Sequence, residues 1–230
     1  MSTKAIFLGH LGLGDHIIQQ AIVNDLAQRY ERVLIFCKHH NIPSVEHMCG
    51  QGIEIIPVAC DRDVRRICAT VVNSSEYDVF GVGIYNNEQK FRSSIASGSP
   101  FDKYFYQQLG MDFSLSHNVS FADGDRWQEV MGLVPDESFC FVHDDMSRNF
   151  NIDMDRLNTP LPIVRPTIHA GTIFDYLPLL RKATEIHCMD SSFALMIDRA
   201  SGIEGKKYIH RYVRHTSANP SYVNGWDIIH

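Results

Sequence analysis

Short, continuously apolar runs rich in β-branched residues alternate with longer amphipathic runs along this chain, and this alternation constrains its fold more than any other feature. Residues 4–10 (KAIFLGH) predict a strand. Residues 15–30 predict a helix, because four apolar residues recur at helical spacing: Ile18, Ile22, Leu26 and Tyr30. Continuously apolar strands joined by helices are typical of a parallel sheet covered on both faces. We therefore predict an α/β protein.

The same alternation predicts two sheets. The first half is expected to contain strands at 4–10, 32–39, 53–60 and 77–85, and helices at 15–30, 43–50 and 61–74, the last capped by Asp61. The pattern loosens over 86–124, where an aromatic helix is expected at 101–110. It resumes with helices at 125–133, 173–184 and 191–202, and with strands at 138–145, 161–166, 185–190 and 206–213. The prediction is a compact pair of Rossmann-like lobes with parallel sheets, 1–124 and 125–230.

Charge and cysteine usage exclude several classes of protein. A chain of 230 residues can bury a sizeable core, and a formal charge of −6 without a run of like charges argues against a general nucleic-acid-binding protein. The six cysteines include no C-x-x-C pair, so free buried thiols are expected rather than disulfides or metal ligands. The adjacent residues His143, Asp144 and Asp145 would alternate faces on a strand, so no metal site is expected there either.

No targeting signal is expected for this chain. Its opening residues, MSTKAIFLGH, lack an apolar signal core, and no stretch approaches the length that a bilayer requires. We therefore expect a cytoplasmic protein without a transmembrane segment.

A glycine-rich turn follows the first predicted strand and leads directly into a helix. It reads GHLGLGDH over residues 9–16, and the amino end of a helix at the carboxyl end of a strand is where phosphates bind in open α/β sheets, which makes Gly12 and Gly14 candidate phosphate-binding residues. The glycine order is GxxGxG rather than GxGxxG, and Cys37 and Lys38 stand where a dinucleotide-binding protein has an acidic residue. A dehydrogenase is therefore disfavoured.

Asp15 in this turn has two interpretations. A carboxylate at the start of a helix is a common cap, because it accepts hydrogen bonds from free N–H groups and is favoured by the helix dipole. It could also act as a general base for a hydroxyl held against it, and His10 and His16 are further candidates for that role.

A second turn of similar chemistry is expected in the second lobe. There the strand 185–190 leads into Asp190, Ser191 and Ser192 at the start of a helix, where hydroxyls and free amides could hold a diphosphate. Helix capping is again the simpler interpretation. Thr172 and Asp175 upstream have capping-box spacing. In a two-lobed protein, the Asp15 and Ser191 turns would face each other across a cleft.

Several basic residues could contact phosphate groups. Arg148 and Arg165 lie nearest to expected carboxyl ends of strands and are therefore the leading candidates. The others are Lys206, Lys207 and Arg211.

The order of these motifs resembles the heptosyltransferase-like group of GT-B glycosyltransferases. The features that carry the resemblance are Gly14-Asp15 at the first helix, Trp127, and the later segment EIHCMDSSFALMIDRA. The resemblance implies that Asp15 is the general base of an inverting transfer and that Ser191 and Ser192 lie near the donor diphosphate.

The function that this resemblance implies is transfer of a sugar from a nucleotide diphosphate sugar to a hydroxyl acceptor such as a saccharide. Residues 125–230 would bind the donor and residues 1–124 the acceptor, with no metal and no cofactor beyond the donor. Two alternatives are a non-catalytic protein of the same fold that binds nucleotide sugars or carbohydrates, and a nucleotide-sugar epimerase, which would convert donor without an acceptor.

Overall fold

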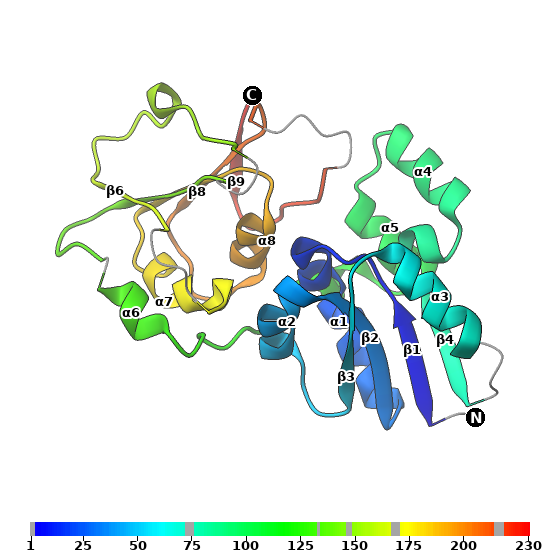
Figure 1. Cartoon of the computed structure of the whole chain (residues 1–230). Helices are drawn as coiled ribbons and strands as arrows, with labels where there is room; N and C mark the ends of the chain where they lie inside the picture. The colour runs from blue at the N-terminus through cyan, green and yellow to red at the C-terminus, as the bar shows by residue number, and fades with distance from the viewer. Residues whose placement is uncertain (1–2, 72–75, 133, 146–148, 167–170, 214–218) are drawn as a thin grey trace. The chain divides into compact units, whose positions relative to one another are not determined.

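The computed structural model describes residues 3–71, 76–132, 134–145, 149–166, 171–213 and 219–230. The chain divides into two compact units, each with its own sheet (Figure 1). Unit 1 contains Met1–Val119 together with Ser217–Ser221, and unit 2 contains Ser120–Thr216 together with Tyr222–His230. The chain therefore returns to unit 1 for one short segment before it completes unit 2.

Unit 1 is built on a parallel sheet with the strand order β3-β2-β1-β4. The strands are β1 (Lys4–Leu8), β2 (Arg32–Lys38), β3 (Ile53–Val58) and β4 (Tyr77–Gly81). The helices are α1 (Leu13–Arg29), α2 (Ile42–Met48), α3 (Asp61–Val71), α4 (Glu88–Ala96) and α5 (Phe101–Gln108), with short 3₁₀ turns at His39–Asn41, Gly83–Tyr85 and Phe113–His117.

The apolar pattern that predicts the strands and helices of unit 1 also fills its core. On one face of the sheet, Ile6 of β1 and Leu34 of β2 pack in the same cluster as Val64 and Cys68 of α3. Helix α1 adds a buried stripe that includes Ile18, Ile22 and Leu26. Burial of one such aliphatic side chain stabilises the fold by about 1.5–3 kcal/mol, so the alternation seen in the sequence is what holds these elements together.

Unit 2 is built on a second parallel sheet, with the strand order β6-β5-β7-β8-β9. The strands are β5 (Cys140–His143), β6 (Ile163–Val164), β7 (Glu185–Cys188), β8 (Lys206–His210) and β9 (Trp226–Ile229). The helices are α6 (Trp127–Met131), α7 (Leu177–Leu180) and α8 (Ser192–Arg199), with 3₁₀ turns at Met154–Arg156 and Ile173–Tyr176.

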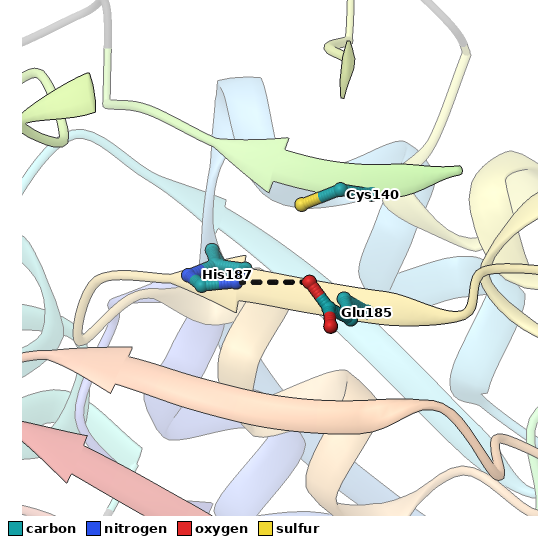
Figure 2. A group of neighbouring side chains, drawn as sticks. All are labelled: Cys140, Glu185 and His187. Carbon is teal, nitrogen blue, oxygen red and sulfur yellow. Dashed lines mark ion pairs between the residues drawn. The ribbon is translucent and has the colours of Figure 1, made fainter. Parts of the chain in front are cut away.

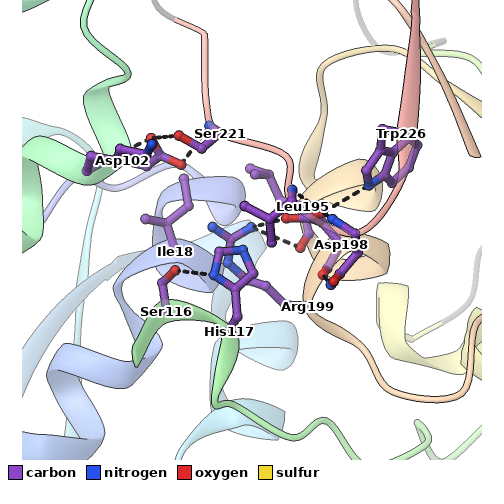
Figure 3. Close-up of polar contacts among 12 residues, drawn as sticks. Ile18, Asp102, Ser116, His117, Leu195, Asp198, Arg199, Ser221 and Trp226 are labelled. Carbon is purple, nitrogen blue, oxygen red and sulfur yellow. Dashed lines mark hydrogen bonds and ion pairs between the residues drawn. The ribbon is translucent and has the colours of Figure 1, made fainter. Parts of the chain in front are cut away.

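Two buried carboxylates, one in each unit, accept hydrogen bonds from residues near position 221 of the same unit (Figure 3). In unit 1, Asp102 of α5 accepts hydrogen bonds from the backbone N–H of Ser221 at 2.8 Å and from its hydroxyl at 3.2 Å. In unit 2, Asp198 of α8 accepts from the backbone N–H groups of Val223 and Asn224, both at 3.0 Å, and from the Trp226 indole at 2.9 Å. The Asp198 contacts connect α8 to the edge strand β9.

Local details differ from the sequence predictions. The helix predicted at 173–184 is a 3₁₀ turn followed by the short α7, in which Pro178 occupies the first turn. Helix α3 includes Asp61 as its first residue, and the expected cap is supplied by Asp63 instead. The Asp63 carboxylate accepts from the backbone N–H groups of Ala59 at 3.1 Å and Cys60 at 3.3 Å.

Two elements have no counterpart among the predictions. Helix α4 lies in the segment where the pattern loosens, and its side chains are largely exposed apart from the buried Phe91. Strand β9 is short and has two exposed residues, Asp227 and Ile228, in its middle. Within the described residues, no helix has the length and hydropathy that crossing a bilayer requires.

Candidate functional site

The carboxyl edge of the unit 1 sheet gathers polar side chains from each strand. His10 follows β1, Lys38 ends β2, Asp61 follows β3, and Tyr85 lies in the turn after β4. Asp15 is in the first turn of α1, beside the same edge. Because the strands are parallel, their carboxyl ends meet where ligands bind in open α/β sheets. We call His10, Asp15, Lys38, Asp61 and Tyr85 the acidic edge cluster.

Asp15 both caps α1 and faces this cluster. Gly12 is the residue before the helix, and its backbone N–H donates to the Asp15 carboxylate. A Cβ atom at position 12 would lie only 2.5 Å from Asp15 Oδ2, so the absence of a side chain lets the carboxylate fold back onto the turn. Burial raises the pKa of Asp15, while the charges of His10 and Lys38 oppose that rise. The capping and functional interpretations of Asp15 are therefore compatible.

His10 is fixed in the cluster by backbone and aromatic contacts. Its Nε2 accepts a hydrogen bond from the Ile84 N–H at 3.3 Å, and its ring lies 4.9 Å from the ring of Phe105 and 5.2 Å from that of Phe91. Burial lowers the pKa of His10, against the charges of Asp15 and Asp61. Since Nε2 is an acceptor, the neutral imidazole carries its proton on Nδ1.

Asp61 and Tyr85 form the other side of the cluster. The Tyr85 hydroxyl donates to Asp61 Oδ1 at 2.6 Å, and burial together with this carboxylate raises the pKa of Tyr85. The Tyr85 hydroxyl therefore stays protonated and donates its hydrogen bond to the Asp61 carboxylate. In this way the structure places the carboxylates of Asp15 and Asp61 near His10, and Lys38 near Asp15.

His16 and Gly14, the other candidates from this turn, have different surroundings. Gly14 is in the first turn of α1. The His16 side chain is buried, and its Nε2 has no hydrogen-bond partner among the described residues. Burial lowers the pKa of His16 to about 4, so the ring is neutral inside the core. Of the two histidines in this turn, His10 is the one that the cluster includes.

The carboxyl edge of the unit 2 sheet forms a second polar group around the start of α8. Ser191 is the N-cap of α8, and its Oγ accepts from the Ala194 N–H at 3.4 Å and lies 3.3 Å from His143 Nδ1. The His143 ring stacks on Phe193 at 4.1 Å, and burial lowers its pKa to about 4. Ser192 is half-buried at the first helical position. The predicted turn therefore exists and begins a helix of two turns.

Arg211 is a basic residue that lies next to this turn. It follows β8, and its Nε lies 3.7 Å from Oδ2 of the buried Asp190. Tyr222 also lies near this carboxylate. Burial and the charge of Asp190 together raise the pKa of Tyr222. We call Asp190, Ser191, Ser192, His143 and Arg211 the α8 cluster.

Arg165 and Arg148 are the leading candidates for phosphate contacts in the sequence, and the structure describes only the first of them. Arg165 follows β6, and its Nε donates to Asp144 Oδ2 at 2.8 Å, while its Nη2 contacts the sulfur of Met154. Its charge is therefore matched within unit 2 by a carboxylate that is itself mostly buried. Arg148 lies outside the described residues.

The capping box at Thr172 and Asp175 is confirmed, and it is structural. Asp175 Oδ2 accepts from the Thr172 N–H at 2.7 Å, and Oδ1 accepts from the Arg126 N–H at 2.7 Å just before α6. Gly124 packs so closely on Asp175 that a side chain there would collide with it. This carboxylate joins two helix starts and is buried away from solvent.

Comparison with solved structures finds the same fold in a known protein. The crystal structure of a glycosyl transferase family 9 protein from Veillonella parvula DSM 2008 matches with a TM-score of 0.56, 10% sequence identity, and coverage of 100% of this chain and 87% of that chain. No family model matches the sequence, and the search of curated proteins finds no match. The predicted fold, two Rossmann-like α/β units with parallel sheets of the GT-B kind, is confirmed.

The residues that sequence reasoning missed follow a recognisable rule. Lys38, Asp61 and Tyr85 all stand at or just after the carboxyl end of a parallel strand. That position was a usable signal, because ligand sites in such sheets form at this edge. Arg211 was among the basic residues considered, but its nearness to Asp190 depends on β8 lying beside β7.

Proposed function

We propose that this chain is an inverting, metal-independent glycosyltransferase that transfers a sugar from a nucleotide diphosphate sugar to a hydroxyl acceptor. The single observation that carries the proposal is the position of Asp15 at the carboxyl edge of the unit 1 sheet. Burial raises its pKa there, and His10 and Lys38 lie close enough to influence it. A shared fold with a glycosyl transferase family 9 protein adds support.

In the proposed reaction the acceptor binds at the acidic edge cluster. Its hydroxyl oxygen attacks the anomeric carbon of the donor, the bond from that carbon to the diphosphate breaks, and the hydroxyl proton passes to Asp15. A carboxylate with a raised pKa is a stronger base, provided that it is ionised at the working pH. The positive charge of Lys38 favours the ionised form, and neutral His10 offers Nδ1–H as a hydrogen-bond donor.

The donor diphosphate is proposed to bind at the α8 cluster. The first N–H groups of a helix have no partner within the helix and carry the positive end of its dipole, which suits an anion. Ser191 and Ser192 add hydroxyl donors, and Arg211 adds a positive charge that can bind the departing diphosphate. Gly12, Gly14 and Arg165 remain secondary candidates for phosphate contacts.

A ligand panel and a turnover assay together test this proposal. The folded protein is heated with a series of nucleotide diphosphate sugars and free nucleotides, since a ligand that binds only the native state raises the melting temperature. Product formation from the donor that binds is then followed with saccharide acceptors. We expect one nucleotide family to raise the melting temperature and one acceptor class to give product.

The other outcomes distinguish the alternatives. Donor binding without turnover on any acceptor would identify a non-catalytic nucleotide-sugar-binding protein. Conversion of the donor sugar without acceptor would identify an epimerase. A flat panel on well-folded protein would overturn the donor-binding proposal altogether.

A further inference from the structure

Three side chains capable of binding a metal meet on one face of the unit 2 sheet (Figure 2). Cys140 is the first residue of β5 and is paired in register with Glu185, the first residue of β7. His187 lies two residues further along β7, so its side chain points to the same face as that of Glu185. The ligand atoms of Cys140, Glu185 and His187 all lie within 4.8 Å of one another.

The spacing of these atoms is close to that of a tetrahedral zinc site. Zinc binds sulfur at about 2.3 Å and nitrogen or oxygen at about 2.0–2.1 Å, which puts neighbouring ligand atoms about 3.3–3.7 Å apart. His187 Nε2 and Glu185 Oε2 are 4.0 Å apart. Binding would therefore draw these atoms together through rotation of the Glu185 and Cys140 side chains, and Figure 2 shows the Glu185 carboxylate turned toward His187.

His187 is an independent indication of a ligand. Its side chain is buried, and among the described residues its Nε2 has no hydrogen-bond partner. A buried polar atom in that state costs free energy, about 1–3 kcal/mol in mutational series, so native structures rarely leave one without a reason.

A hydrogen-bonded chain behind His187 can fix the tautomer that a metal needs. His187 Nδ1 lies 2.8 Å from His210 Nε2, and His210 Nδ1 lies 3.1 Å from the Tyr212 hydroxyl, which accepts from the Asp153 N–H at 3.0 Å. When His187 carries its proton on Nδ1 and donates to His210, the lone pair of Nε2 points into the cluster. Metal-binding histidines are commonly oriented by such a partner on their other nitrogen.

We propose that Cys140, Glu185 and His187 bind one Zn²⁺ ion, with a solvent molecule as the fourth ligand. Binding displaces the Cys140 proton to solvent, and the charges of the resulting thiolate and of the carboxylate then balance that of Zn²⁺. The combination of a soft thiolate with an imidazole favours Zn²⁺ over Mg²⁺ or Ca²⁺. Glu185 is half-buried at the start of its strand, which gives the ion a route from solvent.

The role proposed for this ion is structural. Cys140 and Glu185 stand at the amino ends of β5 and β7, whereas Ser191 follows the carboxyl end of β7. Two of the three ligands therefore stand at the end of the strands opposite to the proposed donor site, and His187 lies between them and that site on β7. Zn²⁺ would cross-link two adjacent strands and stabilise unit 2, while the proposed transfer reaction remains metal-independent.

Cobalt substitution tests the proposal directly. The full chain is stripped with a chelator and titrated with Co²⁺, whose bond to a thiolate gives a charge-transfer band in the near ultraviolet. We expect one equivalent of Co²⁺ to produce the band, Zn²⁺ to abolish it by displacement, and Zn²⁺ to raise the melting temperature of the stripped protein. The variants Cys140→Ala and Glu185→Gln should lose the Zn²⁺-dependent rise.

Cys188→Ala is the matched control. Cys188 is a buried thiol on the same strand as His187, but it points to the opposite face of the sheet. This variant should keep the band and the melting response. Absence of a 1:1 band in the stripped wild-type chain, or a band that survives in Cys140→Ala, would overturn the proposal. If Cys140→Ala does not fold, Glu185→Gln tests the loss of the Zn²⁺-dependent rise in melting temperature, because Glu185 is only half-buried.

Discussion

The imidazole of His10 occupies the space beside Gly83 that any side chain at position 83 would need. Gly83 has φ of +59°, in the left-handed region, and the next N–H, that of Ile84, donates to His10 Nε2. The turn after β4 therefore fixes the orientation of a histidine that follows β1. This relationship makes the geometry of the acidic edge cluster testable by a change outside it.

Gly83→Ala should destabilise unit 1 more than the same change at a left-handed glycine normally does. A Cβ in this region of φ costs about 1–2 kcal/mol, and here it must also displace His10. The control is Gly98→Ala, because Gly98 has φ of +83° and a Cβ added there would have no described atom within 4 Å. Urea unfolding of both variants provides the measurement. Equal losses of unfolding free energy would contradict the described position of His10.

Asp15→Asn should lower the rate of sugar transfer without lowering stability near neutral pH. Removal of a general base typically costs about 10²–10⁴-fold in rate. Because burial disfavours the ionised carboxylate, the amide should leave the free energy of unfolding unchanged or raise it. Asp63→Ala is the control, since Asp63 caps α3 and alanine removes the acceptor oxygen. It should lose stability and keep activity, and an active Asp15→Asn enzyme would remove Asp15 from the reaction.

The transfer rate should fall with decreasing pH at a higher pH than an ordinary aspartate would give. Only the ionised Asp15 can accept the hydroxyl proton, and burial raises the pKa of this carboxyl above its ordinary value of 3.8. A pH profile of kcat/KM measures this pKa in the free enzyme. A profile that stays flat through the acidic range over which the protein remains folded would contradict the assignment.

The double variant Ser191→Ala/Ser192→Ala should weaken donor binding by at least about tenfold, because two hydroxyl donors worth about 1 kcal/mol each are lost. Loss of the N-cap also costs about 1 kcal/mol of stability. Asn87→Ala separates the two effects, because Asn87 caps α4 through the Lys90 N–H and lies in unit 1. Calorimetric titration with the donor should show weaker binding in the serine variant alone. Unchanged affinity there would place the diphosphate elsewhere.

His16 should make the protein less stable as the pH falls from about 6.5 toward 4. The ring has a pKa of about 4 in the folded state and 6.5 in the unfolded state, so the unfolded chain gains a proton first over this window. This amounts to about 2 kcal/mol at about pH 5. His16→Leu should remove that part of the pH dependence. Urea unfolding at neutral and acidic pH measures the difference.

The strands of both sheets other than β9 were predictable, because each lies in a continuous apolar run. The runs at 32–39 and 53–60, for example, are confirmed as β2 and β3. The helix predicted at 173–184 was wrong in detail, because Pro178 lacks the N–H that would bond back into the preceding turn of one continuous α-helix. Strand β9 escaped prediction because its hydrogen bonds to β8 and the contacts of Asp198, rather than a buried apolar run, hold it in place.

The candidate sites were predictable only where one segment contains the whole feature. Gly12 and Asp15 are three residues apart, and Ser191 caps the helix that it begins, so local sequence indicated both turns. The meeting of His10 with Asp61 depends on strand order. Likewise, the closeness of Cys140 to His187 depends on the register between β5 and β7, which no local spacing reveals.

The hydrogen bonds from Ser221 to Asp102 have a consequence for the order of events during biosynthesis. They join residues 119 positions apart, although the four strands of unit 1 all precede residue 82. On the ribosome the nascent sheet could therefore form early, but α5 would remain without this anchor until residue 221 emerged. A nascent chain that stalls before residue 221 is synthesised would therefore carry a unit 1 in which this contact of Asp102 has yet to form.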